Sequence, residues 1–508
     1  MELLKKASDG VRIVLTTLFL SVTAILFAIA FTTTCATDPA TGRVMLTGDS
    51  LLINLLGLAI AFVDAVLLSK CDMDEDRADA MVAFLLVGTF LCGLFFVVVC
   101  DLSASGTAKE LLAFSQKAAT GDLSLLTTPG SAVAVQPARL GFALVLEIMV
   151  RFFGQEATLP FAIANVILLL FAYFFITDFV RHVFQDARIT FLCALLLLFC
   201  QPLLLYTKVL SNVFLSLALS TVSMALFARY LRKKHWAKLT FSVLFCALSV
   251  TVRPESGLVA IALLVILLLT ALTQQRYCLL AAGAGLVAIT LLLPFAVQKG
   301  YEKRAGVTMA AAIPVQADLV SGRSVTESGL GMRDGFPEAL SIRALTGDAQ
   351  KEAIASQSQA YEQLRVENNV SRLDFLLQKL AESWNEPTLS ALNGTFREDG
   401  SMFSKLAEEF HAGDTGKRLM HFSNQILSIL YGLSIIGGAV TLWRKDPIAM
   451  LPGCIIAGAF ICHLLYPAAT DDSAFYLPLF VPYAVAGPCW VAGRIKLPQW
   501  KKKKRRVI

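Results

Sequence analysis

The sequence has little charge: Asp, Glu, Lys and Arg make up only 16% of its 508 residues, against about 25% in a typical soluble domain. Hydrophobic residues make up 56%. This balance excludes a water-soluble globular protein, and the abundance of Leu, Ile, Val and Phe excludes a disordered chain. The sequence also lacks a Walker A motif, a GxGxxG dinucleotide motif and an HExxH zinc motif. ATP-driven and zinc-protease functions therefore lose most of their support.

Cysteine pairing patterns are lacking as well. The 11 cysteines form no CxxC spacing, and the long polar stretch 298–422 contains none of them. Most cysteines lie inside apolar runs, where Cys behaves as a small hydrophobic residue. The pattern excludes a disulfide scaffold.

Long apolar runs dominate what is present. A membrane span needs about 20 mostly apolar residues, and about twelve segments meet that requirement. The predicted spans are 13–33, 51–69, 80–100, 159–180, 189–207, 211–229, 239–253, 256–273, 278–297, 423–442, 447–466 and 474–493. The segment 138–153 is shorter and carries Arg139, Glu147 and Arg151.

The distribution of basic residues decides whether 138–153 crosses the membrane. If it does not cross and the N-terminus is cytoplasmic, nearly every basic cluster, including 229–238 and the tail KKKKRR at 501–506, lies on the cytoplasmic side, as the positive-inside rule requires. If 138–153 crossed, the cluster 229–238 would move outside. We therefore predict a re-entrant or interfacial helix at 138–153. The basic tail beside a span favours contact with anionic lipid over binding of nucleic acid.

These observations predict an all-α polytopic protein of the plasma membrane with both termini in the cytoplasm. Its parts are N-terminal spans at 1–79, a transmembrane core at 80–297 with an external loop at 101–158, a soluble external insert at 298–422, C-terminal spans at 423–494 and a basic cytoplasmic tail at 495–508. Short amphipathic helices in the external loop are expected to lie at the membrane interface.

Ionisable residues at the ends of spans are the first functional candidates in a membrane protein. Asp101 follows the unbroken run FLCGLFFVVVC, at the outer mouth of the third span. A partly desolvated carboxylate there could serve as a base for a hydroxyl group, or simply mark the water boundary. Gln136 and Arg139 flank Pro137, which begins the apolar helix of 138–153. The alternative is an ordinary entry from a loop into a helix.

Basic residues occupy the same outer level further along the chain. Arg253 lies between two spans, followed by Pro254 and Glu255. Its guanidinium is suited to a phosphate, although it could also pair with Glu255 or snorkel. Lys208 lies at the same level.

The insert and the last two spans supply the remaining candidates. Trp384, Asn385 and Glu386 combine a stacking surface with polar groups, as sugar sites do, although a helix end stopped by Pro387 explains them equally well. Asp471, Asp472 and Tyr476 lie at the outer end of the last two spans. The paired Asp residues are weak candidates for binding a divalent cation, because adjacent Asp residues in a loop are usually just solvated.

All candidates fall on the predicted external side, whereas a transporter is expected to place polar groups near the middle of the bilayer. The pattern favours an enzyme that acts on a lipid-linked substrate at the outer interface. The alternatives are a transporter or flippase of lipid-linked sugars, a polysaccharide polymerase or ligase, and a membrane scaffold without catalytic activity.

The order of the motifs resembles the GT-C superfamily of integral-membrane glycosyltransferases, and more closely its bacterial branch similar to protein O-mannosyltransferases and aminoarabinose transferases (glycosyltransferase family 39-like). The matching pieces are Asp101, AATGDLS at 118–124, VQPARLG at 135–141, RFFG at 151–154, Ser211-Asn212, Arg253-Pro254, the KxxxxWNEP pattern at 379–387 and the Tyr-Leu-Pro close at 476–478. The resemblance spans about 80–490. The sequence departs from the usual pattern at Gln136–Arg139, at Lys208 and at Glu255.

The resemblance implies a GT-C-like bundle that transfers a sugar from a polyprenyl-phosphate donor to a lipid, glycan or protein hydroxyl, with inversion. It implies Asp101 as the general base and Arg253 as a binder of the lipid phosphate, and it suggests that Tyr476 closes the site. Arg139 and Lys208 join Arg253 and Tyr476 as candidates for lipid-phosphate binding, and Gln136, Trp384, Asn385 and Glu386 are candidates for sugar or acceptor binding. No cofactor is required by this interpretation, and a divalent cation is left open. A catalytically inactive homologue is a further alternative.

Overall fold

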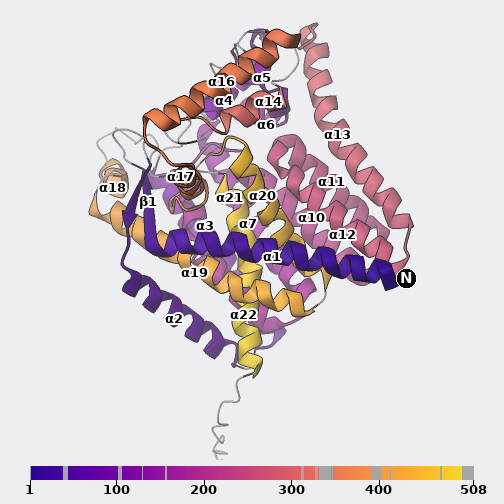
Figure 1. Ribbon diagram of the computed structural model, residues 1–508, viewed down its shortest axis with the longest axis vertical. Coiled ribbons are helices and arrows are strands. Elements are labelled where there is room, and N and C mark those ends of the chain that lie inside the picture. Colours follow the sequence, from indigo (N-terminus) through magenta and orange to yellow (C-terminus); the bar gives the residue numbers. More distant parts are fainter. Residues whose placement is uncertain are drawn as a thin grey trace, which may run out of the picture.

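The protein is an all-α bundle with one short β-hairpin, as a computed structural model shows (Figure 1). The structure describes residues 2–37, 44–71, 73–100, 106–128, 130–154, 157–309, 314–325, 330, 342, 345, 347–391, 402–411, 413–444, 446–469 and 472–494.

The N-terminal half contains two long helices around the hairpin, and then the core. Its elements are α1 (Glu2–Thr32), β1 (Thr33–Thr37), β2 (Val44–Gly48), α2 (Leu51–Leu68), α3 (Glu75–Val99), α4 (Gly106–Ala119), η1 (Ser124–Leu126), α5 (Ala132–Val135), η2 (Pro137–Arg139), α6 (Leu140–Phe153), α7 (Thr158–Phe184), α8 (Ala187–Leu198), α9 (Gln201–Tyr206), α10 (Val213–Lys233) and α11 (Trp236–Val252). The two strands pair in antiparallel register from Thr33 opposite Gly48 to Thr37 opposite Val44.

The C-terminal half completes the bundle and supplies the insert. Its elements are η3 (Pro254–Ser256), α12 (Gly257–Gln274), α13 (Cys278–Ala305), α14 (Val315–Ser321), α16 (Gly347–Glu367), α17 (Arg372–Trp384), α18 (Met402–His411), α19 (Asp414–Arg444), η5 (Pro447–Met450), α20 (Leu451–Leu465), α21 (Ser473–Tyr476), η6 (Leu477–Phe480) and α22 (Val481–Arg494).

Ten helices in the described part of the chain are long and apolar enough to cross a membrane, which makes this a multi-pass membrane protein. They coincide with ten of the twelve predicted spans. At the other two predicted positions the structure has shorter apolar helices, Ala187–Leu198 and Trp236–Val252. Crossing by these two remains a prediction. All eleven cysteines are free thiols.

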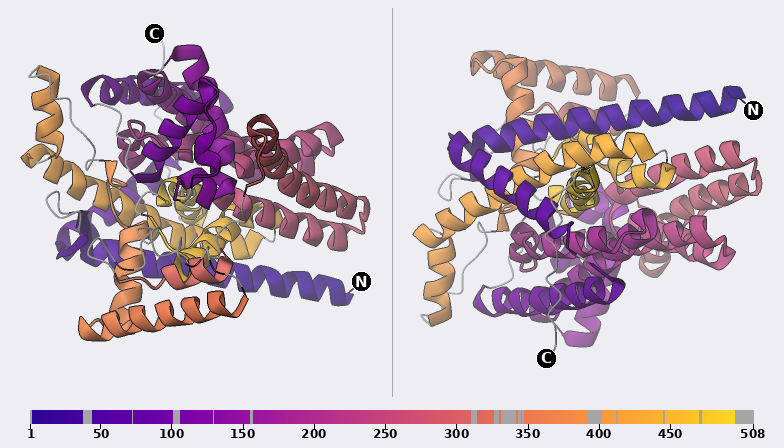
Figure 2. Two further views of the ribbon diagram at one scale, coloured as in Figure 1. Left: turned by 90° about the horizontal axis from the view of Figure 1, so that it is seen from above. Right: turned by 90° about the horizontal axis from the view of Figure 1, so that it is seen from below.

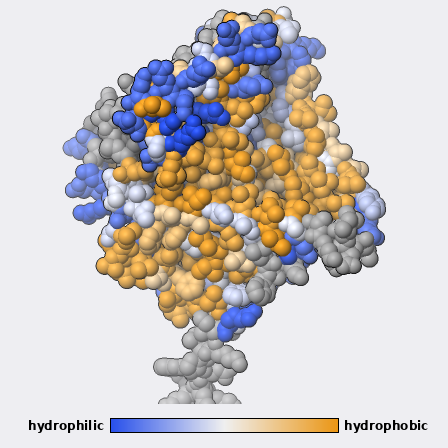
Figure 3. All heavy atoms as spheres, in the orientation of Figure 1, coloured by the Kyte–Doolittle hydropathy of each residue, from blue (hydrophilic) through white to orange (hydrophobic). Residues whose placement is uncertain are grey.

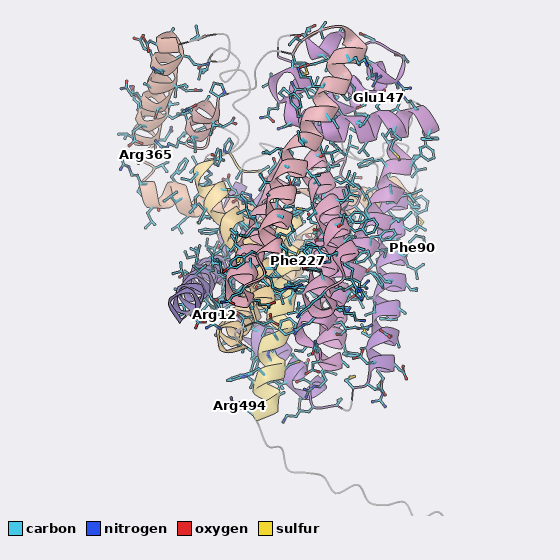
Figure 4. The ribbon with its side chains drawn as sticks, turned by 90° about the vertical axis from the view of Figure 1, so that its right-hand side faces the viewer. Arg12, Phe90, Glu147, Phe227, Arg365 and Arg494 are labelled. Carbon is cyan, nitrogen blue, oxygen red and sulfur yellow. The ribbon has the colours of Figure 1, made fainter. Side chains whose placement is uncertain are left out.

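Helix α6, at the position of the ambiguous segment 138–153, has 14 residues and is not among the ten long apolar helices. At the top of Figure 1 it gathers with α4, α5, α14 and α16, where the long helix α13 also ends. The view in Figure 4 shows the helices around Glu147 lying across the bundle rather than along it. That this helix is re-entrant or interfacial stays a prediction.

Several predicted cytoplasmic segments meet at one end of the bundle. Arg181, near the end of α7, pairs with Asp79 at the start of α3, and Arg188 donates to the carbonyl of Ser69 after α2 (3.4 Å). Arg232, near the end of α10, pairs with Asp446 before α20 (2.9 Å). These three contacts bring together the segments after α2, after α7, after α10 and before α20, which the positive-inside rule places on one side.

Small residues allow the helices to approach closely, as is common in membrane bundles. A Cβ placed on Gly141 of α6 would lie 1.7 Å from the carbonyl oxygen of Thr251 on α11. Ser220 of α10 hydrogen-bonds Ser249 of α11 at 2.8 Å. We call α4, α5, η2 and α6 the interfacial layer. The contact between α6 and α11 fixes this layer over the core, and it brings the chain near Arg139 toward the chain near Arg253.

The surface divides into apolar and hydrophilic zones. Figure 3 shows a broad apolar surface over the bundle, with a hydrophilic layer at the upper left where Figure 1 places α16. From above, Figure 2 shows α16 and α17 beside α1, and α4 to α6 toward the opposite side. We call the end of the bundle that carries α4 to α6, α16 and α17 the insert side.

Candidate functional site

The corner between α11 and α12 places Arg253 on the insert side. Pro254 cannot continue α11, so the chain turns through η3 before α12 begins. The Arg253 Nη2 atom lies 2.8 Å from Asp472 Oδ1, and the two side chains are only 4% and 6% exposed. Glu255 lies 3.8 Å from the Nε atom of Arg253. Two predicted candidates that are 219 residues apart thus form one buried ion pair.

Aromatic side chains surround this pair. The Arg253 guanidinium lies 5.7 Å from the centre of the Phe475 ring. The neighbouring Tyr476 stacks on Trp384 of α17, with ring centres 5.5 Å apart and planes inclined by 29°. His463, near the end of α20, is 5.2 Å from the Trp384 ring, and its Nε2 atom is 4.0 Å from Asp472 Oδ2. We call Arg253, Asp472, His463, Tyr476 and Trp384 the Arg253 cluster.

The turn before α10 packs against the same corner. The side-chain amide of Asn212 donates to the carbonyl of Val252, immediately before Arg253 (3.1 Å). Asn165 of α7 donates to the carbonyls of Thr207 and Val209, on either side of Lys208 (both 3.0 Å). Lys208 itself is 2% exposed. The side-chain amides of Asn165 and Asn212 therefore hold Lys208 in a fixed turn beside the corner that carries Arg253.

Gln136 and Arg139 approach the corner from the interfacial layer. The Arg139 Nε atom donates to the Gln136 side chain, so the two candidates pair with each other. Both are half-buried. The short helix η2 that carries Arg139 contacts α11, and Gly141 abuts Thr251 two residues before Arg253.

Asn385 and Glu386 take part in contacts within the protein. The Asn385 amide donates to the carbonyl of Leu26 on α1 (3.0 Å), and the Glu386 carboxylate accepts from the hydroxyl and N–H of Thr388 (2.7 and 3.1 Å). Burial raises the pKa of Glu386 to about 7, although its hydrogen bonds lower it. Trp384, Asn385 and Glu386 are at most 2% exposed. In this conformation they form packing beneath the insert rather than an open surface for a sugar.

Lys379 anchors the same segment. Its Nζ atom donates to the carbonyl oxygens of Gly322, Tyr466 and Leu464 at 2.6, 2.9 and 3.3 Å. Burial, together with the smaller effect of the nearby Arg323 charge, lowers the pKa of Lys379 to about 8. One side chain thus connects α17, the turn after α14 and the end of α20.

Asp101 and Asp471 lie outside the described residues, so the structure does not place the predicted base or the first residue of the paired Asp motif. Asp472, the second residue of that motif, is engaged by Arg253 and by the N–H of Ala469 (3.0 Å). Within the described ranges, no group of three or more His, Cys, Asp and Glu side chains could hold a metal ion.

A second charged cluster was missed by the sequence analysis. Glu147 of α6, labelled near the top of Figure 4, is 2% exposed and binds three side chains. It accepts from Tyr301 (2.7 Å), Arg304 (2.8 and 3.1 Å) and Arg151 (2.7 Å). Although burial raises it, these hydrogen bonds bring the pKa of Glu147 below its ordinary value. The cluster fastens the interfacial layer to the end of α13.

His463 was also missed, although a signal for it exists. It is an ionisable residue near the end of an otherwise apolar run, which is the criterion that selected Asp101 and Arg253. Glu147 had been noted only because its charge argued against a membrane crossing.

The fold and the site define a multi-pass membrane protein with a buried guanidinium, a carboxylate, an imidazole and stacked aromatic rings beneath an insert. Such a cluster can hold an anionic group if Arg253 exchanges its carboxylate partner for that group. No known protein-family model matches the chain, and no protein of curated function matches its sequence.

Proposed function

We propose that the protein is a membrane glycosyltransferase. It transfers a sugar from a polyprenyl-phosphate donor to a hydroxyl of a lipid, glycan or protein acceptor on the insert side. We place it in the plasma membrane with both termini in the cytoplasm and the insert outside. The proposal names no organic cofactor and leaves a divalent cation open.

One observation supports this function best: three distant parts of the chain meet at the corner that carries Arg253. Tyr476 comes from α21 and Asp472 is the residue before it, and Trp384 comes from α17. The turn that carries Lys208 is joined to the corner through Asn212, which donates to the carbonyl of Val252. Lys208, Tyr476 and Trp384 were selected from the sequence as parts of a lipid-phosphate or sugar site, and Asp472 as a weak candidate for binding a divalent cation. This proximity of Arg253, Asp472, Tyr476 and Trp384 supports a shared site in the proposal.

The reaction we propose is a single displacement. The acceptor oxygen forms a bond to the anomeric carbon of the sugar, and the bond from that carbon to the phosphate oxygen breaks. The polyprenyl phosphate leaves with the bonding electrons, and the acceptor proton passes to the Asp101 carboxylate. Arg253 stabilises the negative charge that develops on the leaving phosphate, which lowers the barrier because the charge is greater in the transition state than in the donor.

Asp472 gives the site a closed resting state in this proposal. The Arg253 guanidinium is already neutralised by Asp472 at 2.8 Å and is almost inaccessible to solvent. A donor phosphate therefore has to displace or share Asp472, and the aromatic side chains over the pair have to move apart. The Nε2 atom of His463 lies 4.0 Å from the second oxygen of Asp472, so His463 is placed to stabilise that carboxylate when Arg253 binds the phosphate instead.

The test is sugar transfer in proteoliposomes that contain the purified full-length chain. A panel of radiolabelled polyprenyl-phosphate sugars is offered with a membrane lipid extract as the source of acceptors. We expect one donor to be consumed, with transfer reduced at least a hundredfold in Asp101→Asn, because general base catalysis contributes about 10²–10⁴-fold. We expect a similar loss in Arg253→Lys, which keeps the charge but not the paired donors of the guanidinium.

The matched control is Arg229→Lys. Arg229 also pairs with an Asp, Asp178 of α7, at 2.6 Å, but it lies near the end of α10 opposite the insert side. Transfer should survive in this variant. Consumption of no donor, or equal activity in all of these variants, would contradict the proposal.

A further inference from the structure

Helix α17 exposes an apolar stripe although it lies outside the ten long apolar helices. Leu373, Leu376 and Leu377 are 65%, 39% and 38% exposed, and Leu380, one turn further along, is buried. The spacing of i, i+3, i+4 and i+7 places the four leucines on one face of the helix. Arg372 and Asp374 are exposed elsewhere on the same helix. A stripe of this kind in water would be a liability, so it calls for an apolar neighbour.

The contacts of α17 fix its depth in the molecule. Asn385, directly after the helix, donates to the carbonyl of Leu26, which lies six residues before the end of α1 at Thr32. At about 1.5 Å per residue, this contact is about 9 Å inside the end of that helix. Lys379, in the middle of α17, binds carbonyls at the end of α20, at Leu464 and Tyr466. Helix α17 therefore enters the bundle at the level where two of the long apolar helices end.

At that level a helix that leaves the bundle sideways meets lipid rather than bulk water. Figure 4 shows the insert helices standing out beside the bundle, with α16 (the upper helix, near Arg365) above the shorter helix that joins the core. In Figure 3 the apolar surface of the bundle continues up to the hydrophilic layer formed at α16. Strand β2, which contacts α17, also exposes an apolar side chain, Leu46, at 42%.

We propose that α17 is an interfacial helix whose stripe of Leu373, Leu376 and Leu377 inserts into the lipid leaflet on the insert side. Interfacial helices bury their apolar face about 5–10 Å into the boundary between headgroups and acyl chains. The partner is the lipid surface itself. This inference does not depend on the proposed enzymatic function.

The arrangement has a mechanical consequence for the Arg253 cluster. The helix that touches lipid through its first two turns carries Lys379 and Trp384 in its last two turns. Trp384 stacks on Tyr476, next to the residues that hold Arg253. The lipid-facing stripe and the Trp384 ring of the Arg253 cluster therefore lie on one helix.

The test uses fluorescent probes on single cysteines in the full-length protein. The exposed cysteines Cys71, Cys92 and Cys278 are first replaced by serine. A small fluorophore is then attached at Leu373→Cys, Leu376→Cys or Leu377→Cys, with Asp374→Cys as the matched control on the same turn. Proteoliposomes of phosphatidylcholine are compared with and without lipids that carry a nitroxide quencher on the acyl chain, and with iodide in the water.

We expect the lipid-borne quencher to act at least twofold more strongly at the three leucine positions than at position 374. Iodide should show the opposite order. Because the three leucine side chains are exposed, these substitutions should leave the fold intact, as judged by the elution volume of the labelled protein. Equal access of iodide to all four positions would overturn the inference. So would protection of the leucine positions from both quenchers, or failure to label them, since either result means that protein covers the stripe.

Discussion

Removing Arg253 should destabilise the protein more than removing the charge of Asp472, although the two form one ion pair. Both side chains are at most 6% exposed, so neither charge can rely on water when its partner is lost. Breaking a buried pair from one side costs about 3–5 kcal/mol. We expect a loss of this size in Arg253→Met, which leaves the Asp472 carboxylate with the N–H of Ala469 and with His463 at 4.0 Å.

Asp472→Asn should cost less, about 1.5–3 kcal/mol, which is the contribution of a hydrogen bond to a charged group. Arg253 keeps a second carboxylate in this variant, because Glu255 lies 3.8 Å away and is 34% exposed. Asn also keeps an oxygen for the N–H of Ala469. The double variant R253M/D472N should be more stable than Arg253→Met alone, because no unpaired carboxylate is left at position 472.

The assay is reversible unfolding in mixed micelles followed by circular dichroism. The matched cycle uses Arg229→Met and Asp178→Asn, whose side chains are 30% and 10% exposed. That pair should show a weaker coupling, since solvent screens it more. Equal losses for Arg253→Met and Asp472→Asn, or a double variant less stable than either single variant, would refute the assignment of a closed, buried pair.

Three further predictions concern the parts around this pair. Because burial raises the pKa of Glu386 to about 7 from 4.5, the folded state holds its proton more tightly, so stability should fall by up to about 3 kcal/mol as pH rises from about 4.5 to 7. The unfolding midpoint should therefore fall as pH rises across that range. Glu386→Gln should remove this pH dependence, and the control Glu352→Gln, at an exposed position, should keep it. Gly141→Ala should destabilise the protein by about 1–3 kcal/mol, because the added Cβ would lie 1.7 Å from the Thr251 carbonyl oxygen. Gly57→Ala, whose Cβ meets nothing within 4 Å, is the control in the same unfolding assay. Equal unfolding midpoints for the two variants would contradict the close contact of α6 and α11. Glu147→Gln should weaken the attachment of the interfacial layer to α13, so amide exchange in α4 and α6 should accelerate while exchange in α10 stays unchanged; uniform exchange in all three helices would count against that attachment.

The class of fold could be predicted from the sequence because lipid imposes simple requirements. Ten long apolar helices follow from runs such as 80–100 and 159–180, and the basic clusters identified the end of the bundle where Arg181, Arg188 and Arg232 gather. Helix α8 is shorter than its predicted span, because the chain breaks at Phe199 and Cys200 before α9. The run of apolar residues continues through this break, so hydropathy alone could not locate it.

The candidate site could be predicted only in part. Position at the ends of spans selected Arg253, Asp472 and Tyr476, but it could not show that Asp472 neutralises Arg253, since that contact joins residues 219 positions apart. It also could not show that Asn385 and Glu386 bind backbone groups. The Glu147 cluster was invisible for the same reason: its partners Tyr301 and Arg304 follow more than 150 residues later, at the end of α13.

The central claim is that Arg253 receives the phosphate of a polyprenyl lipid, and binding tests it most directly. Radiolabelled polyprenyl phosphate is titrated against three forms of the protein in lipid nanodiscs: wild type, R253M/D472N and R229M/D178N. We expect saturable binding to the wild type and to R229M/D178N. Binding to R253M/D472N should be at least tenfold weaker, since a tenfold change equals about 1.4 kcal/mol and a charge-assisted pair contributes at least that much. The same affinity in all three forms would contradict this claim.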